Sequence, residues 1–162
     1  MADYLTLFNS NMLTEIHNRY VAKDILALNE HTEPYGITLS QKDCTELAES
    51  RSEFLIENER IEVGTGAVRR IIEEFCESPY VSQMNFKQTV ADLLECFYYI
   101  KTETEDRVDD ESVIEFLKYV FENDAGGDVA SIYLSTALET FIEYGKSQQA
   151  GPRKRSEDRY FN

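Results

Sequence analysis

The stretch from Asn85 to Lys101 carries the widest apolar stripe in the chain. Its large apolar side chains recur at the three- and four-residue spacing that places them on one face of an α-helix: Val90, Leu93, Leu94, Phe97, Tyr98 and Ile100. A helix that is apolar over so much of its circumference is buried by its neighbours. The stretch therefore predicts the central helix of an all-α domain.

Shorter stripes with the same period predict further helices around it. They cover residues 9–33, 40–58, 64–78, 110–123 and 129–144. In the first of these, Leu13, Ile16 and Tyr20 continue into the apolar line that holds Val21 and Ile25. We therefore expect all five of these side chains to face the core.

The ends of the chain look different from its body. Residues 2–8 are mixed in character and are expected to be extended or irregular, and Gly145 is placed to cap the last helix. The fold class expected is all-α, a compact bundle of five to six helices. It forms a single domain over residues 1–145, and residues 146–162 form a flexible, basic tail.

The charge is strongly negative and uneven. The net charge is -15, and residues 1–145 contain 11 cations against 29 anions. A body this acidic repels phosphate backbones, so nucleic acid is not an expected partner. No basic leader and no run of 18 apolar residues is present in the sequence, so we expect no membrane partner either.

The three cysteines, Cys44, Cys76 and Cys96, are widely spaced and lie on apolar helical stripes. An odd number of cysteines without a C-x-x-C pattern is typical of a reducing compartment. These residues predict a cytoplasmic protein with inert, buried thiols.

Two cations interrupt the apolar lines, and they are the first candidates for a site. Arg51 lies seven residues after Cys44 and four before Leu55, and Lys101 lies four residues after Phe97. Arg51 is interpreted either as half of a structural salt bridge or as the floor of a pocket for an anionic ligand. Lys101 either stabilises the C-terminus of its helix or joins that pocket, with Tyr98 beside it.

Gly64 and Gly66 precede a predicted helix, where backbone N–H groups can surround an anion. A tight turn before a helix explains the same two glycines without a ligand. The segment lacks the third glycine of a dinucleotide fingerprint and the Gly-Lys-Ser/Thr of a phosphate loop. Both interpretations stay open.

Nothing in the sequence indicates a catalytic residue, a cofactor or a metal. The two histidines, His17 and His31, lack the Glu-x-x-His spacing of a helical di-metal site. Carboxylate runs such as Glu73-Glu74 are typical of solvated helix faces. We therefore expect neither a metal site nor a cofactor.

Four strings occur in order and resemble a family of uncharacterised bacterial proteins, a domain of unknown function. They are Glu49-Ser50-Arg51-Ser52-Glu53, Arg60-Ile61-Glu62-x-Gly64-x-Gly66, Phe75-x-x-Ser78-Pro79-Tyr80 and Phe97-Tyr98-Tyr99-x-Lys101-x-Glu103. The resemblance covers about residues 25–145, and the basic tail departs from it. It implies a bacterial origin and supplies no activity.

The function expected is a non-enzymatic protein–protein interaction or adaptor module that binds another protein or itself. Aromatic side chains beyond what a small bundle buries would suit an interface. The residues concerned are Tyr80, Phe86, Tyr98 and Tyr99. The alternative is a small anionic-ligand binding protein, or an enzyme, that uses Arg51 and Lys101.

Overall fold

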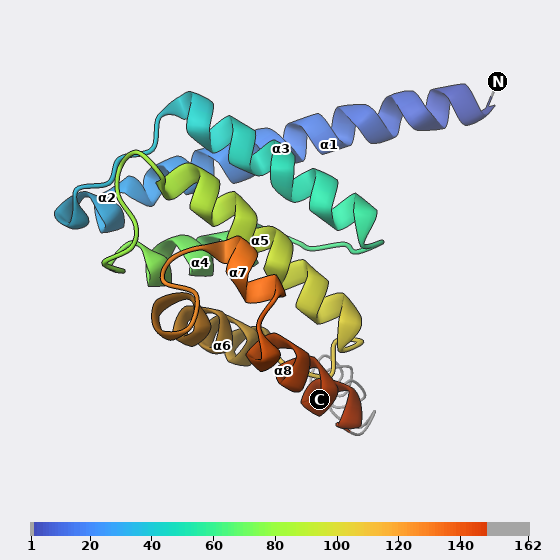
Figure 1. Ribbon diagram of the computed structural model, residues 1–162. Coiled ribbons are helices and arrows are strands. Elements are labelled where there is room, and N and C mark those ends of the chain that lie inside the picture. Colours follow the sequence, from blue (N-terminus) through green and yellow to red (C-terminus); the bar gives the residue numbers. More distant parts are fainter. Residues whose placement is uncertain (1, 149–162) are drawn as a thin grey trace, which may run out of the picture.

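The computed structural model describes the backbone of residues 2–148 and the side chains of residues 12–148. The elements are α1 (Ala2–Ala27), α2 (Asn29–Thr32), the 3-10 helix η1 (Glu33–Tyr35), α3 (Gln41–Glu57), α4 (Ala67–Phe75), α5 (Phe86–Glu103), α6 (Asp110–Asn123), α7 (Val129–Tyr133) and α8 (Thr136–Ser147). No β-strand occurs within residues 2–148. The helices pack together as a bundle (Figure 1), which confirms the predicted all-α fold.

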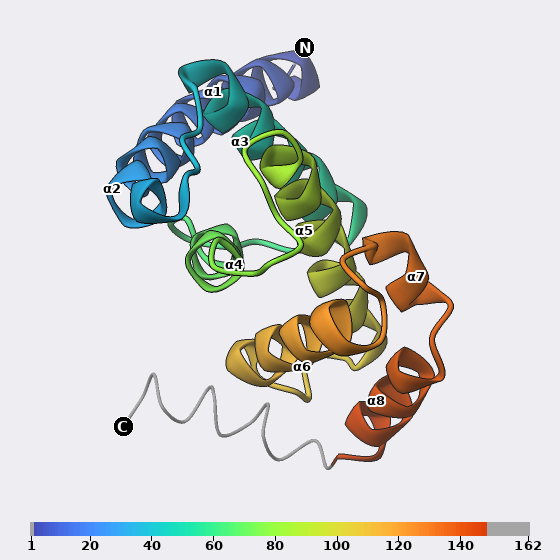
Figure 2. The same ribbon diagram turned by 60° about the vertical axis from the view of Figure 1, so that its left-hand side comes forward.

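The helix predicted to be central does lie at the centre. α5 contacts α3, α4, α6, α7 and α8. Turning the molecule shows α1 to α3 on one side of α5 and α6 to α8 on the other (Figure 2). The bundle is therefore organised around α5, which five other helices contact.

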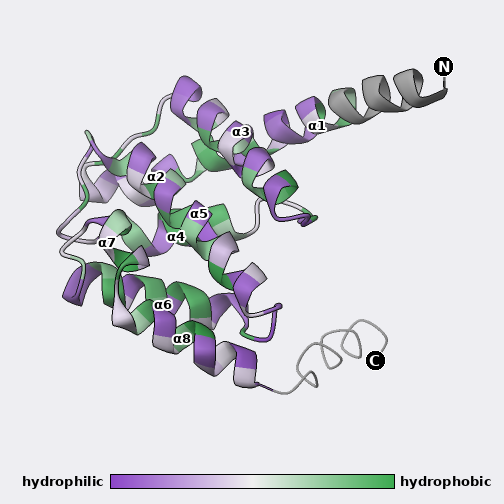
Figure 3. Ribbon diagram, turned by 45° about the vertical axis from the view of Figure 1, so that its right-hand side comes forward, coloured by the Kyte–Doolittle hydropathy of each residue, from purple (hydrophilic) through white to green (hydrophobic). Residues whose placement is uncertain are grey.

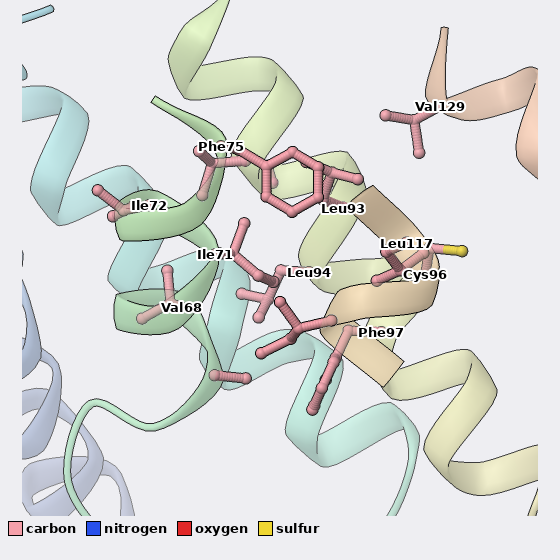
Figure 4. Packing of buried hydrophobic residues seen from close by; sticks show 14 of the residues in the cluster. Val68, Ile71, Ile72, Phe75, Leu93, Leu94, Cys96, Phe97, Leu117 and Val129 are labelled. Carbon is pink, nitrogen blue, oxygen red and sulfur yellow. The ribbon is translucent and has the colours of Figure 1, made fainter. Parts of the chain in front are cut away.

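The core is built from the stripe of α5 and the apolar faces of α4 and α6. Leu93, Leu94 and Phe97 of α5 lie between the side chains of α4 and Leu117 of α6 (Figure 4). All four of these side chains are buried. Complete burial of one such side chain stabilises a fold by about 1.5–3 kcal/mol, so this layer contributes substantially to the stability of the core.

Two helices begin where their capping residues predict. Ser40 accepts a hydrogen bond from the backbone of Asp43 at 3.0 Å, and the Asp43 carboxylate accepts one from the backbone of Ser40 at 3.1 Å. Asp109 accepts from the backbone of Ser112 at 3.0 Å at the start of α6. These bonds satisfy N–H groups that the first turn of a helix leaves free.

The prediction for the N-terminal residues was wrong in two respects. α1 already begins at Ala2, and residues 2–8 contain no proline or glycine that would stop a helix. Leu13, Ile16 and Tyr20 are exposed, whereas Val21 and Ile25 are fully buried. The reason is that α1 packs mainly against α3, so the side of α1 that carries these three residues is not covered by a helix (Figures 1 and 3).

The expected single helix over residues 129–144 is broken. α7 ends at Tyr133, and Ser135 caps α8 by accepting from the backbone of Leu138 at 3.2 Å. Gly145 does not end a helix but lies within α8, where an added Cβ would come within 2.5 Å of Thr104. A glycine is needed there because the connector after α5 packs directly against the backbone of α8.

The C-terminal boundary is a prediction that the structure leaves open. Of the predicted tail, Lys146 and Ser147 belong to α8 and Gln148 is its C-cap, whereas residues 149–162 lie outside the described residues. None of the helices described combines the length and the apolar character needed to cross a bilayer.

Candidate functional site

Arg51 lies on the buried face of α3, and its side chain is 0% exposed. Its Nε and Nη2 atoms donate to Oε1 of Glu62 at 3.3 and 3.1 Å. Nη2 also donates to the backbone carbonyls of Gly64 at 2.6 Å and of Glu62 at 3.3 Å. The guanidinium therefore fixes the segment that connects α3 to α4.

Tyr98 of α5 approaches the same carboxylate from the other side. Its hydroxyl donates to Oε1 of Glu62 at 2.8 Å. Burial raises the pKa of Tyr98, and the negative charge and hydrogen bond of Glu62 raise this pKa further. The phenol therefore stays protonated at neutral pH and remains a hydrogen-bond donor.

Gly66 provides the space in which Glu62 lies. It is the residue before α4 and has a φ of 61°. A Cβ at this position would come 2.1 Å from Oε1 of Glu62. The carboxylate of Glu62 therefore lies beside the residue that precedes α4.

α1 supplies the last member of this group. Nε2 of His17 lies 3.4 Å from Nη1 of Arg51. A guanidinium can only donate, so the imidazole nitrogen accepts in this contact. We refer to Arg51, Glu62, Tyr98 and His17 as the Arg51 cluster, which joins α1, α3, α5 and the α3–α4 segment.

Lys101 lies near the C-terminus of α5 and has a different set of partners. Its Nζ donates to the carbonyl of Val108 at 2.6 Å, lies 2.7 Å from Oδ1 of Asp110 and 3.8 Å from Oδ1 of Asp106. Within the described part of the chain, Lys101 and Arg51 share no polar partner. The structure thus brings Arg51, Tyr98, Gly64 and Gly66 together and places Lys101 apart from them.

In the segment between α3 and α4, charged and apolar side chains alternate, and the apolar ones face water. The charged side chains point inward: Arg60 to Asp106, at 2.5 Å, and Glu62 to Arg51. The apolar side chains point outward, and Ile61 and Val63 are 98% and 92% exposed. Charged and apolar residues alternate over positions 60–63, but alternation alone does not say which side faces water, because the inward partners come from other elements of the fold.

A second set of exposed apolar residues lies on α1. Met12, Leu13, Ile16 and Tyr20 are all about half exposed or more. We call these four residues the α1 stripe. His17, which follows Ile16 in the sequence, contacts Arg51. Arg51 in turn pairs with Glu62, the residue between Ile61 and Val63 in the sequence. The α1 stripe and the two outward residues therefore flank the same buried cluster.

Two of the four aromatic residues expected at an interface are core residues instead. Phe86 and Tyr98 are fully buried, whereas Tyr80 and Tyr99 are exposed. Tyr98 is buried at the position where its hydroxyl donates a hydrogen bond to the carboxylate of Glu62.

The two arginines after Gly66 are occupied by carboxylates. Arg70 contacts Glu111 at 2.7 Å, and Arg69 lies 3.6 Å from Glu73. An anionic ligand would compete with these carboxylates, as it would with Glu62 at Arg51.

The thiols are poor nucleophiles in this fold. All three cysteines are buried and unpaired, as predicted. Burial raises the pKa of Cys44 to about 11 and that of Cys96 to about 12. At neutral pH both are therefore protonated, and the thiolate is the reactive form. No group of three or more potential metal ligands occurs among the described residues.

A surface groove of about 460 Å³ runs between α1 and α3. The charged residues that line it are Glu15, Arg19, Lys23 and Glu49, two of each sign. The charged side chains of the lining therefore sum to zero net charge.

Comparison with known proteins gives a family and no activity. No curated protein and no solved structure matches the chain. The model of one protein family, described as a family of unknown function (DUF6323), matches residues 24–151, which include every member of the Arg51 cluster except His17. The chain belongs to this family of unknown function.

Proposed function

We propose that this protein is a non-enzymatic interaction module that binds another protein through the α1 stripe together with Ile61 and Val63. The observation that supports this is the segment at residues 60–63. Ile61 and Val63 are almost fully exposed there, whereas the charged side chains of Arg60 and Glu62 are mostly buried and paired. Exposed apolar side chains of this size gain free energy when a partner covers them.

The free energy available to such an interface is substantial. Each large apolar side chain that moves from water into a contact contributes about 1.5–3 kcal/mol. The Arg51 cluster holds the α3–α4 segment in place before any partner arrives. Preorganisation of this kind lowers the entropic cost of binding.

We further propose that the protein acts in the cytoplasm of a bacterium. Free, buried thiols at Cys44, Cys76 and Cys96 suit a reducing compartment. The bacterial origin rests on the resemblance of the strings around Arg51 and Tyr98. The acidic body, with 26 anions against ten cations over residues 28–148, disfavours nucleic acid as the partner.

The test is capture of partner proteins by the immobilised chain and by two variants. Ile61→Asp with Val63→Asp places charge on the proposed surface, and Leu134→Asp places it on an equally exposed leucine between α7 and α8. We expect the double variant to lose a captured protein that the Leu134→Asp control retains, with the helical circular dichroism unchanged in both. Equal capture by all three proteins would overturn the proposal.

A further inference from the structure

We propose that the α1 stripe packs against the α1 stripe of a second copy of this chain, with the two helices antiparallel. This inference rests on the proposed function, because it names one partner for part of the same surface. The product is a symmetric dimer in which Ile61 and Val63 remain available to another protein.

The spacing of the stripe suits a helix–helix seam. Leu13, Ile16 and Tyr20 follow one another at intervals of three and four residues, as apolar residues do along paired helices. All three are exposed and lie on a side of α1 that α3 does not cover. A second helix can therefore lie alongside these exposed side chains.

The charge of α1 favours a second copy at this position over any other. Residues 12–27 contain two cations and two anions, whereas residues 28–148 contain ten cations and 26 anions. Two copies that met through their bodies would bring like charges together, which opposes association. Two copies that meet through α1 avoid this repulsion.

The charged residues beside the α1 stripe can pair with the same residues of a second copy. Glu15 and Arg19 are both exposed and lie one helical turn apart, 3.3 Å from one another within the chain. A two-fold axis near His17 places Leu13 beside Tyr20 of the other copy. The same axis places Glu15 beside Arg19 of the other copy, and Arg19 beside its Glu15. A symmetric dimer requires this reciprocity of contacts.

The test is a charge swap followed by light scattering and sedimentation equilibrium at several protein concentrations. We expect the unmodified chain to dimerise, and Ile16→Asp to be monomeric. Glu15→Arg and Arg19→Glu each place like charges across the axis, so each alone weakens dimerisation about ten-fold. Mixing these two variants should restore association, because the two introduced side chains then face one another with opposite charge. In the same mixed dimer, the unchanged Arg19 of one variant faces the unchanged Glu15 of the other.

The mixing experiment separates the intermolecular pairs from the pair within one chain. Neither single variant retains the Glu15–Arg19 pair within its own α1, so recovery on mixing cannot come from a more stable helix. Leu134→Asp is the control and should dimerise like the unmodified chain. A chain that is monomeric at every concentration, or variants that do not recover on mixing, would overturn the dimer.

Two results distinguish a failure of the dimer from a failure of the proposed interaction function. If the chain is monomeric but Ile16→Asp still loses a captured protein, only the identity of the partner is wrong. If Ile16→Asp and the Ile61, Val63 double variant change neither self-association nor capture, the proposed function fails as well.

Discussion

Arg51 and Lys101 are both buried cations on otherwise apolar helix faces, yet the structure uses them differently. The partners of Arg51 come from α1, from α5 and from the α3–α4 segment, and Tyr98 is 47 residues away in sequence. The partners of Lys101 all lie within nine residues of it: Asp106, Val108 and Asp110. Arg51 therefore joins distant parts of the chain, whereas Lys101 closes a local connector.

The difference shows what burial of a charge can accomplish. Arg has five donors in a rigid fork, so one guanidinium can satisfy a carboxylate, two carbonyls and an imidazole at once. Lys101 carries a single ammonium at the end of α5, where the helix dipole and the free carbonyls already favour a cation. Four substitutions can break or sharpen this comparison.

Arg51→Met is expected to have the largest effect. It leaves the Glu62 carboxylate without its cation and frees the α3–α4 segment, so we expect unfolding to become easier by about 3–5 kcal/mol. Urea denaturation monitored by circular dichroism measures the change. Arg69→Met, which removes a half-exposed arginine from the surface, is the control and should cost far less. A smaller loss for Arg51→Met than for Lys101→Met would reverse the comparison.

Gly66→Ala should destabilise the fold by about 2 kcal/mol, because the new Cβ meets Oε1 of Glu62 and the positive φ is unfavourable for a residue with a side chain. Gly64→Ala is the matched control, because its φ is also positive but an added Cβ there meets nothing within 4 Å. Thermal unfolding measures how much more stability Gly66→Ala loses than Gly64→Ala. This difference is the free energy of displacing the Glu62 carboxylate. Equal costs would mean that Glu62 relaxes freely.

Lys101→Met should cost about 1.5 kcal/mol at low ionic strength, because it removes the donor to the carbonyl of Val108. The carboxylates of Asp106 and Asp110 are substantially exposed, so salt screens their part of the interaction. We expect the cost of this substitution to shrink in high salt, measured in paired urea titrations. The cost of Arg51→Met should not change, and an equal salt dependence would contradict the comparison.

Tyr98→Phe should have the smallest effect at neutral pH, about 1 kcal/mol, because it removes one hydrogen bond to Glu62. Its effect on pH dependence is distinct. The pKa of Tyr98 is raised by burial and by Glu62, so the unfolded chain loses this proton first as the pH rises. In the unfolded chain, Tyr98 has the ordinary tyrosine pKa of about 10. The stability that the protonated Tyr98 hydroxyl contributes is therefore complete below this pH and is lost as the pH rises above it.

Urea titrations at about pH 8 and about pH 11 test the alkaline loss of stability. The free energy of unfolding should fall less steeply with pH in Tyr98→Phe than in the unmodified chain. Tyr119→Phe, at an exposed position, should leave the slope unchanged. If the two variants have the same slope, Tyr98 does not control the alkaline transition.

Much of the helical fold could be predicted because its signals are local. The stripe of α5 and the caps at Ser40 and Asp109 depend on residues a few positions apart, and all were found in place. The failures are equally informative. Leu13 and Ile16 have helical spacing but no covering helix, and Gly145 makes room for Thr104 instead of ending α8. Periodicity predicts a face, but it does not say whether anything packs on that face.

The candidate site was predictable only in outline. An arginine on an apolar line has to be paired, because a lone buried charge is too costly, and this reasoning identifies Arg51 from the sequence. It does not choose Glu62 from 31 acidic residues, nor predict that Tyr98 and His17 join it. The alternation of charged and apolar residues over positions 60–63 likewise does not show that Ile61 and Val63 face water.

The sequence by itself determined most of the helices, the caps at Ser40 and Asp109, the central position of α5, the buried thiols and the two cations that required partners. These properties follow from spacing and composition, which act over one or two helical turns. Only the tertiary structure decided which carboxylate reaches Arg51, why Gly66 has no side chain, and which apolar residues of α1 and the α3–α4 segment remain exposed. Those outcomes depend on which distant elements meet in space, because burial and charge pairing are properties of the assembled fold.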